Sequence, residues 1–195
     1  MTRAAMLRTA LLAVAAVSPA HVRRVDIRPS PPARYGLGRP ATPDDIRAWD
    51  VSVMPNGTGL PSGSGTAVPQ GSTIFLQKCA RCHGLTGREG PFDRLVGREP
   101  RQGFPFGRDE SLVRTIGNYW PYSTTVYDYI DRAMPYDAPG SLKPDEVYGL
   151  VAFLLWRNEI IADTAVMNAR TLPRVRMPAR DRFVPDNRRG GREVR

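Results

Sequence analysis

The chain has 195 residues, enough for one domain of ordinary size with long tails but short for two full domains. Hydrophobic residues make up 41% and charged residues 24%, as in soluble globular proteins, while 19 prolines and 18 glycines indicate long irregular segments. The formal net charge of +9 is not accompanied by basic residues interleaved with aromatic residues, so a nucleic-acid partner is not expected.

The first twenty residues have the pattern of a secretory signal peptide. Arg3 and Arg8 precede an apolar run over 11–17, and small residues lead to Ala20, after which we expect cleavage. A membrane-spanning helix needs about 20 apolar residues, and neither this run nor any later segment reaches that length. We therefore expect residues 1–20 to be removed and the mature protein to be periplasmic, without a transmembrane segment.

Residues 21–69 are rich in proline, glycine and serine, which predicts a long irregular N-terminal arm. One short helix is expected in it, because Thr42 is a good capping residue and Pro43 suits the first turn. Asp44 and Asp45 follow in that turn. The rest of the arm cannot bury enough apolar surface to fold alone, so it either packs on another surface or has no fixed structure.

Residues 70–160 are assigned as the folded domain. Ile74, Phe75 and Cys79 recur at helical spacing, which predicts a helix directly before and through the cysteine motif. The first expected segments of the domain are a helix over 70–82, a loop over 84–107 and a short helix over 110–116.

Two longer helices are expected after residue 120. One begins after Ser123, which can cap it, and ends before Pro135. The other begins at Pro144, with Asp145 and Glu146 in its first turn, where acidic residues suit the positive end of the helix dipole. Apolar residues of this helix recur at the spacing of one face that packs on a core. No run alternates as a strand does, so the predicted fold class is all-α.

Residues 161–195 are predicted to form an extended basic C-terminal tail. Nine arginines fall between Arg170 and Arg195, against three acidic residues, and Phe183 is the one aromatic residue among them. A solvated, partly extended tail is the simpler interpretation. The alternative is a basic strap that binds along an acidic partner protein.

Both cysteines and one of the two histidines lie within a Cys-x-x-Cys-His motif formed by Cys79, Cys82 and His83. This spacing is typical of haem c attachment, in which each thiol adds to one vinyl group and the adjacent imidazole reaches the iron. A structural zinc site usually needs four such ligands, and His21 stands at the edge of the mature chain. A redox pair of the thioredoxin type needs a βαβ context, and a simple disulfide leaves His83 without a role. The motif therefore predicts one covalently bound haem c, with His83 as an iron ligand.

Methionine is favoured as the second axial ligand, because a second histidine would have to come from His21. Met134 stands out since it precedes Pro135 just after a predicted helix, where a loop can fold over the far face of the haem. Core filler or surface residue is the ordinary role of a methionine, and it remains the alternative. The other candidates of the mature chain are Met54, Met167 and Met177.

Aromatic residues precede Met134, among them Trp120 and Tyr122. They are candidates for packing against the haem or for a hydrogen bond to a propionate, with plain core packing as an equal alternative. The carbonyl of Pro91 is a candidate for orienting the His83 ring.

His/Met ligation raises the reduction potential of haem iron and leaves no open coordination position for a substrate. We therefore expect a single-electron carrier that is not an enzyme on its own. A haem enzyme or gas sensor with a displaceable ligand is the alternative from another class.

The segment Gly71-Ser-Thr-Ile-Phe75-Leu-Gln-Lys-Cys79-Ala-Arg-Cys-His83 resembles the first helix and haem site of class I cytochromes c. The resemblance implies that the first and last helices cross at Gly71, next to Phe75. Phe75 would then meet the last helix near Val151, Phe153 or Leu154.

Other segments resemble the cytochrome subunit of periplasmic sulfur dehydrogenases, often called SoxD, and related sulfite dehydrogenase cytochromes. The resemblance runs from about residue 35 to 183 and is carried by Tyr35-Gly-Leu-Gly-Arg-Pro-Ala-Thr-Pro, Ala48-Trp-Asp-Val-Ser-Val, Gly57-Thr-Gly-Leu-Pro-Ser-Gly-Ser-Gly65, Ile116-Gly-Asn-Tyr-Trp-Pro-Tyr122 and Arg132-Ala-Met-Pro135. Well-known members carry two haem sites in a longer chain, whereas this chain has a single Cys-x-x-Cys-His motif.

This resemblance implies a molybdopterin-containing dehydrogenase subunit that oxidises a sulfur compound and passes electrons to the cytochrome. Such an oxidation releases electrons in pairs, so two transfers are needed per turnover. A downstream cytochrome or oxidase would then receive them. The alternative is a free periplasmic electron shuttle between another dehydrogenase and a terminal oxidase.

Overall fold

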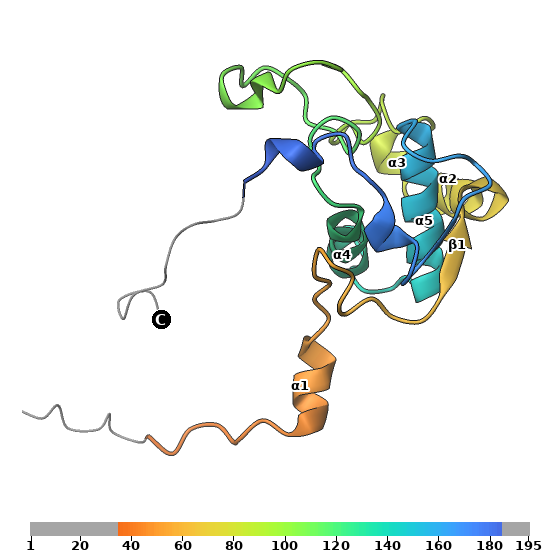
Figure 1. The fold of residues 1–195 in the computed structure, drawn as a ribbon. Coiled ribbons are helices and arrows are strands. Elements are labelled where there is room, and N and C mark those ends of the chain that lie inside the picture. The colour runs from red at the N-terminus through yellow and green to blue at the C-terminus, as the bar shows by residue number, and fades with distance from the viewer. Residues whose placement is uncertain (1–34, 185–195) are drawn as a thin grey trace, which may run out of the picture. The chain divides into compact units, whose positions relative to one another are not determined.

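The structure, a computed structural model, describes residues 35–184 (Figure 1). The expected signal peptide, His21 and residues 185–195 of the expected tail lie outside the described residues. The chain divides into two units, 1–40 and 41–195, and the described residues of the first unit have no regular structure. The regular helices of the second unit are α1 (Pro43–Trp49), α2 (Ser72–Lys78), α3 (Ala80–His83), α4 (Ser123–Ala133) and α5 (Pro144–Arg157).

Two short strands accompany the helices. β1 (Ser64–Thr66) pairs antiparallel with β2 (Val166–Asn168), with Gly65 opposite Met167. The sequence did not predict these strands, because three residues are too few for an alternating pattern to appear. The regular structure of the described residues is nevertheless mainly helical, as expected. None of their helices is both long and apolar enough to cross a membrane.

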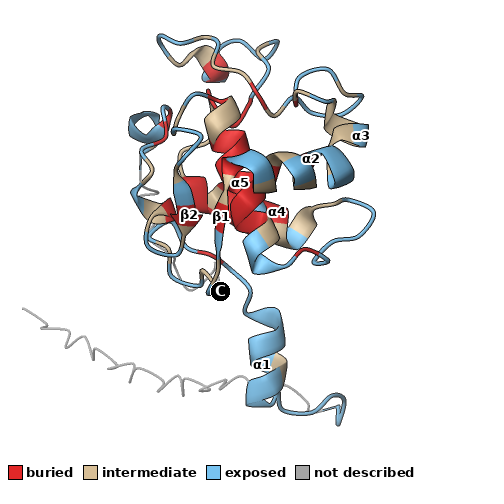
Figure 2. Cartoon of the chain, turned by 90° about the vertical axis from the view of Figure 1, so that its right-hand side faces the viewer, coloured by how far each residue is buried: buried red, intermediate tan, exposed pale blue. Residues whose placement is uncertain are grey.

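Helix α1 begins as the sequence predicts. The Thr42 hydroxyl accepts a hydrogen bond from the Asp45 amide, and the Asp45 carboxylate accepts one from the Thr42 amide at 2.8 Å. Pro43 occupies the first turn, where its missing amide hydrogen costs nothing. No residue of α1 is buried, and Figure 2 shows the helix exposed along most of its length.

The helix predicted over 70–82 is present but divided at Cys79. A π-helical segment over Ala67–Gly71 leads into α2, and Cys79 departs from helical geometry with φ −122° and ψ −33°. Its amide still donates to the Phe75 carbonyl at 2.9 Å, and the His83 amide donates to the Cys79 carbonyl at 3.0 Å. Gly84, with φ +79°, ends α3 in a conformation that favours glycine.

Helices α2 and α5 cross where two glycines meet. A Cβ atom on Gly71 would stand 2.0 Å from the carbonyl oxygen of Gly149, so the close approach requires a glycine there. Beside the crossing, the Phe75 and Phe153 rings are 4.9 Å apart between centroids. The expected meeting of Phe75 with the last helix is therefore confirmed.

Helix α5 is the centre of the core. All nine residues of 147–155 are buried, and Figure 2 shows the helix buried along most of its length. The apolar stripe predicted one packed face, but α5 is covered on several sides. The π-helical segment, β1, α2, α4 and β2 all contact it. This position explains why α5 is so apolar.

Two expectations in the middle of the chain are wrong. The short helix predicted over 110–116 is absent, and the Asp109 carboxylate instead accepts hydrogen bonds from the amide and hydroxyl of Ser111, a local turn that competes with a helix. Ser123 does not cap α4, because its hydroxyl donates to the Leu172 carbonyl at 2.7 Å. Helix α4 does end at Ala133, as predicted.

Segments on both sides of the helical domain pack on it. Before α2, the Val53 amide donates to the buried Asp128 carboxylate of α4 at 2.8 Å. After α5, Leu172 and Met177 are almost fully buried. Phe183 lies in a ring cluster with Phe104, Phe106 and Tyr119. Residues from about 51 to 183 thus contribute to a common packed unit.

Candidate functional site

The two cysteines lie on one helical turn at the start and near the end of α3. The Cys82 amide donates to the Cys79 carbonyl at 3.1 Å, and both side chains are half-buried free thiols. Residues three apart on a helix share a face, so both thiols can reach one planar group. Burial raises the pKa of the Cys79 thiol to about 11, which keeps that thiol protonated at neutral pH.

His83 ends α3 and has a fixed ring orientation. Its Nδ1 lies 2.8 Å from the carbonyl oxygen of Asp93. A carbonyl can only accept, so Nδ1 carries a proton, and in the neutral imidazole Nε2 then has the free lone pair. This is the arrangement by which histidine ligands present nitrogen to a metal while a second contact sets the ring orientation.

The carbonyl that orients His83 is that of Asp93 and not that of Pro91, which the sequence suggested. The loop folds back through hydrogen bonds from the Phe92 amide to the Cys82 carbonyl at 3.2 Å and from the Leu95 amide to the Gly87 carbonyl at 2.9 Å. These contacts bring the residue after Phe92 over the ring. Sequence spacing alone could not show this register.

Met134 is the first residue after α4 and is half-buried against the core. The loop that follows it reaches the motif helix, because the Arg81 guanidinium lies 2.7 Å from the Asp137 carboxylate. The structure therefore brings α3 and the Met134 loop together. No local pattern in the sequence predicts this pair, because its two members are 56 residues apart.

Trp120 and Tyr122 are both half-buried. The Trp120 ring packs on the core and meets Tyr129 edge to face at 5.8 Å. The Tyr122 ring lies beneath the guanidinium of Arg180, which is 4.4 Å from its centroid. Arg180 belongs to the segment after α5, and no local sequence signal linked it to Tyr122.

The donor set suits a covalently bound haem. Two free thiols on one turn, an imidazole with an available Nε2 and a nearby thioether are the groups that such a cofactor uses. Large apolar side chains close to the motif, Leu85 and Phe92, remain exposed in the protein chain. A large flat apolar cofactor is the kind of group that would pack against such side chains.

The helix crossing and the Cys-x-x-Cys-His motif define a class I cytochrome c. The family model for cytochrome c matches residues 68–158. The chain belongs to this family, and it is an electron-transfer protein with covalently bound haem c.

One solved structure is similar over most of the chain: the crystal structure of the sulfane dehydrogenase SoxCD from Paracoccus pantotrophus. The two chains are 39% identical, with a TM-score of 0.68, and the match covers 79% of this chain and 73% of that one. A comparison with curated protein sequences found no significant match.

Proposed function

We propose that this chain is the haem subunit of a molybdopterin-containing sulfur or sulfite dehydrogenase. It accepts electrons singly from that partner and passes them to a downstream cytochrome or oxidase. The observation that carries this proposal is the similarity to SoxCD, which covers 79% of the chain and so extends well beyond residues 68–158. A likeness confined to the cytochrome segment would favour no particular partner.

In this proposal Cys79 and Cys82 form the thioether bonds to the haem, and His83 and Met134 are the axial ligands. The free thiols, the Asp93 contact that leaves Nε2 available and the Arg81–Asp137 contact beside Met134 support the assignment. The bound haem supplies one-electron oxidation and reduction of its iron. Because two protein ligands fill the axial positions, the chain is not an enzyme on its own.

Trp120 and Tyr122 are proposed to pack against the haem or its propionates. Their half-buried positions next to α4 leave part of each ring available, and Trp120 lies on the core that Met134 also contacts. The Arg180 guanidinium over Tyr122 supplies positive charge close to this region.

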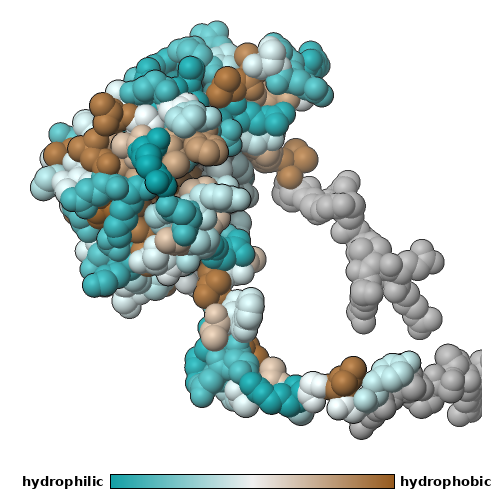
Figure 3. All heavy atoms as spheres, turned by 180° about the vertical axis from the view of Figure 1, so that it is seen from behind, coloured by the Kyte–Doolittle hydropathy of each residue, from teal (hydrophilic) through white to brown (hydrophobic). Residues whose placement is uncertain are grey.

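Exposed apolar side chains on helix α1 favour a stable protein partner. Ile46 and Trp49 are three residues apart, share one face of the helix and are both exposed, Trp49 by 86%. Figure 3 shows the surface of this segment as mainly hydrophilic, with isolated hydrophobic residues. A well-capped helix that presents such side chains is typical of a protein–protein contact. We propose that α1 binds the dehydrogenase subunit.

The test is purification from the native host under mild conditions, followed by a molybdenum assay and by reduction of the haem with sulfite or thiosulfate. Co-purified molybdenum with substrate-dependent reduction is the expected result. A lone periplasmic haem protein that neither compound reduces would overturn the proposal and favour the free shuttle. The variant Trp49→Ala should release the partner, whereas Val184→Ala, an equally exposed apolar change, should retain it.

A further inference from the structure

Asn158, the residue that follows α5, is fully buried and uses its amide on three backbone groups. Its Oδ1 accepts a hydrogen bond from the Gly97 amide at 2.9 Å. Its Nδ2 donates to the carbonyls of Leu95 at 3.2 Å and of Leu154 at 2.8 Å. The Leu154 contact belongs to the helix itself, whereas the other two cross to the loop after the haem motif.

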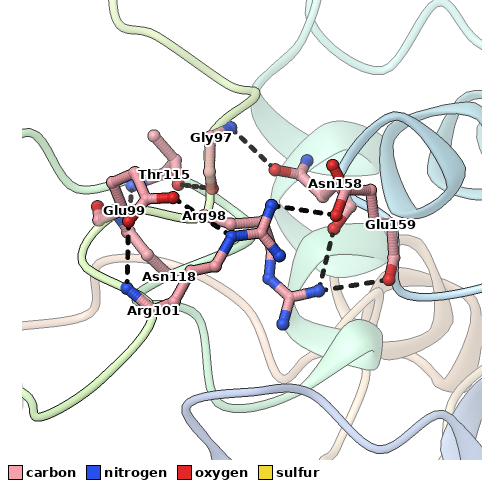
Figure 4. A network of polar contacts seen from close by, with 8 residues as sticks. All are labelled: Gly97, Arg98, Glu99, Arg101, Thr115, Asn118, Asn158 and Glu159. Carbon is pink, nitrogen blue, oxygen red and sulfur yellow. Dashed lines mark hydrogen bonds and ion pairs between the residues drawn. The ribbon is translucent and has the colours of Figure 1, made fainter.

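That loop is the one that orients His83. Leu95 and Gly97 follow Asp93 by two and four residues, and the Asp93 carbonyl accepts the hydrogen bond from His83 Nδ1. Figure 4 shows Asn158 directed toward Gly97 from the end of α5. The amide of Asn158 therefore contacts the loop only two to four residues after the histidine contact.

Arg98 adds two hydrogen bonds between this loop and the end of α5, a contact region that we call the loop–helix junction. Its Nη1 donates to the carbonyls of Asn158 at 3.2 Å and Glu159 at 3.1 Å, which are free at the end of a helix (Figure 4). The Thr115 hydroxyl donates to the Gly97 carbonyl at 2.6 Å. The backbone of the loop is thus held on both sides.

Gly117 packs closely against Asn158 and the loop, and there is no space for a side chain at this position. A Cβ atom there would stand 2.4 Å from Asn158 Oδ1 and 2.4 Å from the Gly97 carbonyl oxygen. Any added atom must push Asn158 or the loop away. A substitution at Gly117 therefore offers a second way to disturb the contact without removing the amide.

We propose that Asn158 is a positioning residue for the axial histidine: its contacts to Leu95 and Gly97 hold the loop so that the Asp93 carbonyl stays on His83 Nδ1. The inference rests on the proposed ligation by His83. A strong acceptor on Nδ1 makes the imidazole a more basic ligand, which favours the oxidised iron and lowers the reduction potential. Loosening the loop should accordingly raise the potential.

The experiment compares the holoprotein with three variants. In Asn158→Ser the hydroxyl can still bond the Leu154 carbonyl one turn earlier but is too short to reach the loop. Gly117→Ala displaces the same contact sterically. Tyr148→Phe is the matched control, because it removes a hydrogen bond to the Pro61 carbonyl from the other end of α5. We expect the potential to rise in the first two variants and to stay unchanged in the control.

Hydrogen exchange measured by nuclear magnetic resonance gives a second test, which begins with the unmodified protein. In the unmodified holoprotein, the His83 Nδ1 proton and the Gly97 amide should exchange with solvent through a common opening, with the same response to denaturant. In Asn158→Ser and Gly117→Ala, both exchange rates should increase by roughly tenfold or more.

Two failures are distinguishable. Absence of covalent haem from the unmodified protein, or its unchanged attachment and spectrum after His83→Ala, would contradict the proposed function. Fully haem-loaded Asn158→Ser and Gly117→Ala with the potential and His83 proton exchange of the unmodified protein would overturn the positioning role alone. Exchange rates of the His83 Nδ1 proton and the Gly97 amide that respond differently to denaturant in the unmodified protein would also overturn it.

Discussion

The Arg81 guanidinium and the Asp137 carboxylate form an ion pair at 2.7 Å that joins the helix of the two cysteines to the loop after Met134. The attraction of Asp137 raises the pKa of Arg81 above its ordinary value. Both side chains are exposed, by 78% and 64%, so water and salt screen the pair. The contact indicates which segments are neighbours and contributes little to their stability.

Asp137→Asn should therefore leave the free energy of unfolding unchanged. The measurement is urea unfolding of the holoprotein at low and at high salt, because a pair that mattered would lose its contribution as ionic strength rises. A clear fall in the unfolding midpoint at low salt, absent at high salt, would show that the pair holds the loop in place.

Gly71→Ala should be strongly destabilising, because the new Cβ would stand 2.0 Å from the Gly149 carbonyl oxygen and 2.8 Å from the Phe153 Cβ. Backbone on one side and a packed ring on the other leave no way to relieve the clash except by separating α2 from α5. We expect a loss of at least about 2 kcal/mol in the free energy of unfolding. Gly107→Ala is the matched control, since a Cβ there meets nothing within 4 Å. Equal stability of the two variants would contradict the crossing geometry.

Local sequence signals predicted the parts of the fold that are determined locally. The capped start of α1, the helix at the motif, the end of α4 before Pro135 and the start of α5 at Pro144 all follow from residues within one or two turns. The meeting of Phe75 with Phe153 came from resemblance to a family and not from spacing.

Contacts between distant segments could not be predicted in this way. Gly65 and Met167 pair across about a hundred residues, and neither three-residue strand has a pattern of its own. Ser123 is a residue type that often caps helices, but its hydroxyl donates a hydrogen bond to the Leu172 carbonyl in the segment after α5. At the candidate site, the motif is local and was found, whereas the Asp93 contact depends on a loop register that only the folded chain reveals.

Leu172→Ala tests whether the segment after α5 belongs to the stable unit. The Leu172 side chain is fully buried, and its carbonyl accepts the Ser123 hydroxyl of α4. Removing a buried leucine leaves a cavity and costs about 2–5 kcal/mol of unfolding free energy. Val184→Ala, in the same segment but exposed, should cost nothing measurable. Chemical unfolding of both variants checks this, and a Leu172→Ala protein as stable as the control would mean that the segment packs only loosely.

Glu146 should make the stability of the domain sensitive to acid. The Lys143 amide first, and then Lys78, hold the pKa of this carboxyl below its ordinary value near 4.5. A group with a lowered folded-state pKa stabilises the fold above its unfolded-state pKa, and that contribution is lost as the pH falls through the folded-state value. The stabilisation is thus present at neutral pH, begins to fall near pH 4.5 and is lost as the pH falls through the lower folded-state pKa.

Glu146→Gln should consequently be less stable than the unmodified protein at pH 7, with a smaller difference at pH 3 to 4, in urea unfolding at each pH. Lys78→Met is a useful comparison, because it removes the 2.7 Å ion pair while leaving the 2.9 Å hydrogen bond from the Lys143 amide. It should retain most of the acid dependence. A stability difference for Glu146→Gln that is the same at every pH would rule out this linkage.

Met134→Ala distinguishes an electron carrier from a haem protein with an open coordination position. If Met134 fills the second axial position, the unmodified reduced haem should ignore carbon monoxide, and the variant should bind it. The thioether also favours the reduced iron, so its removal should lower the reduction potential. Met54→Ala is the matched control, because Met54 is exposed and lies outside α4 and its following loop. Absorption spectra of both variants with and without carbon monoxide are the measurement.

Two results would contradict Met134 as the ligand. One is carbon monoxide binding in the unmodified protein. The other is a methionine-type spectrum that survives Met134→Ala and is lost in Met54→Ala. The loop after α4 would then lie beside the haem, through its contact with Arg81, without supplying an iron ligand.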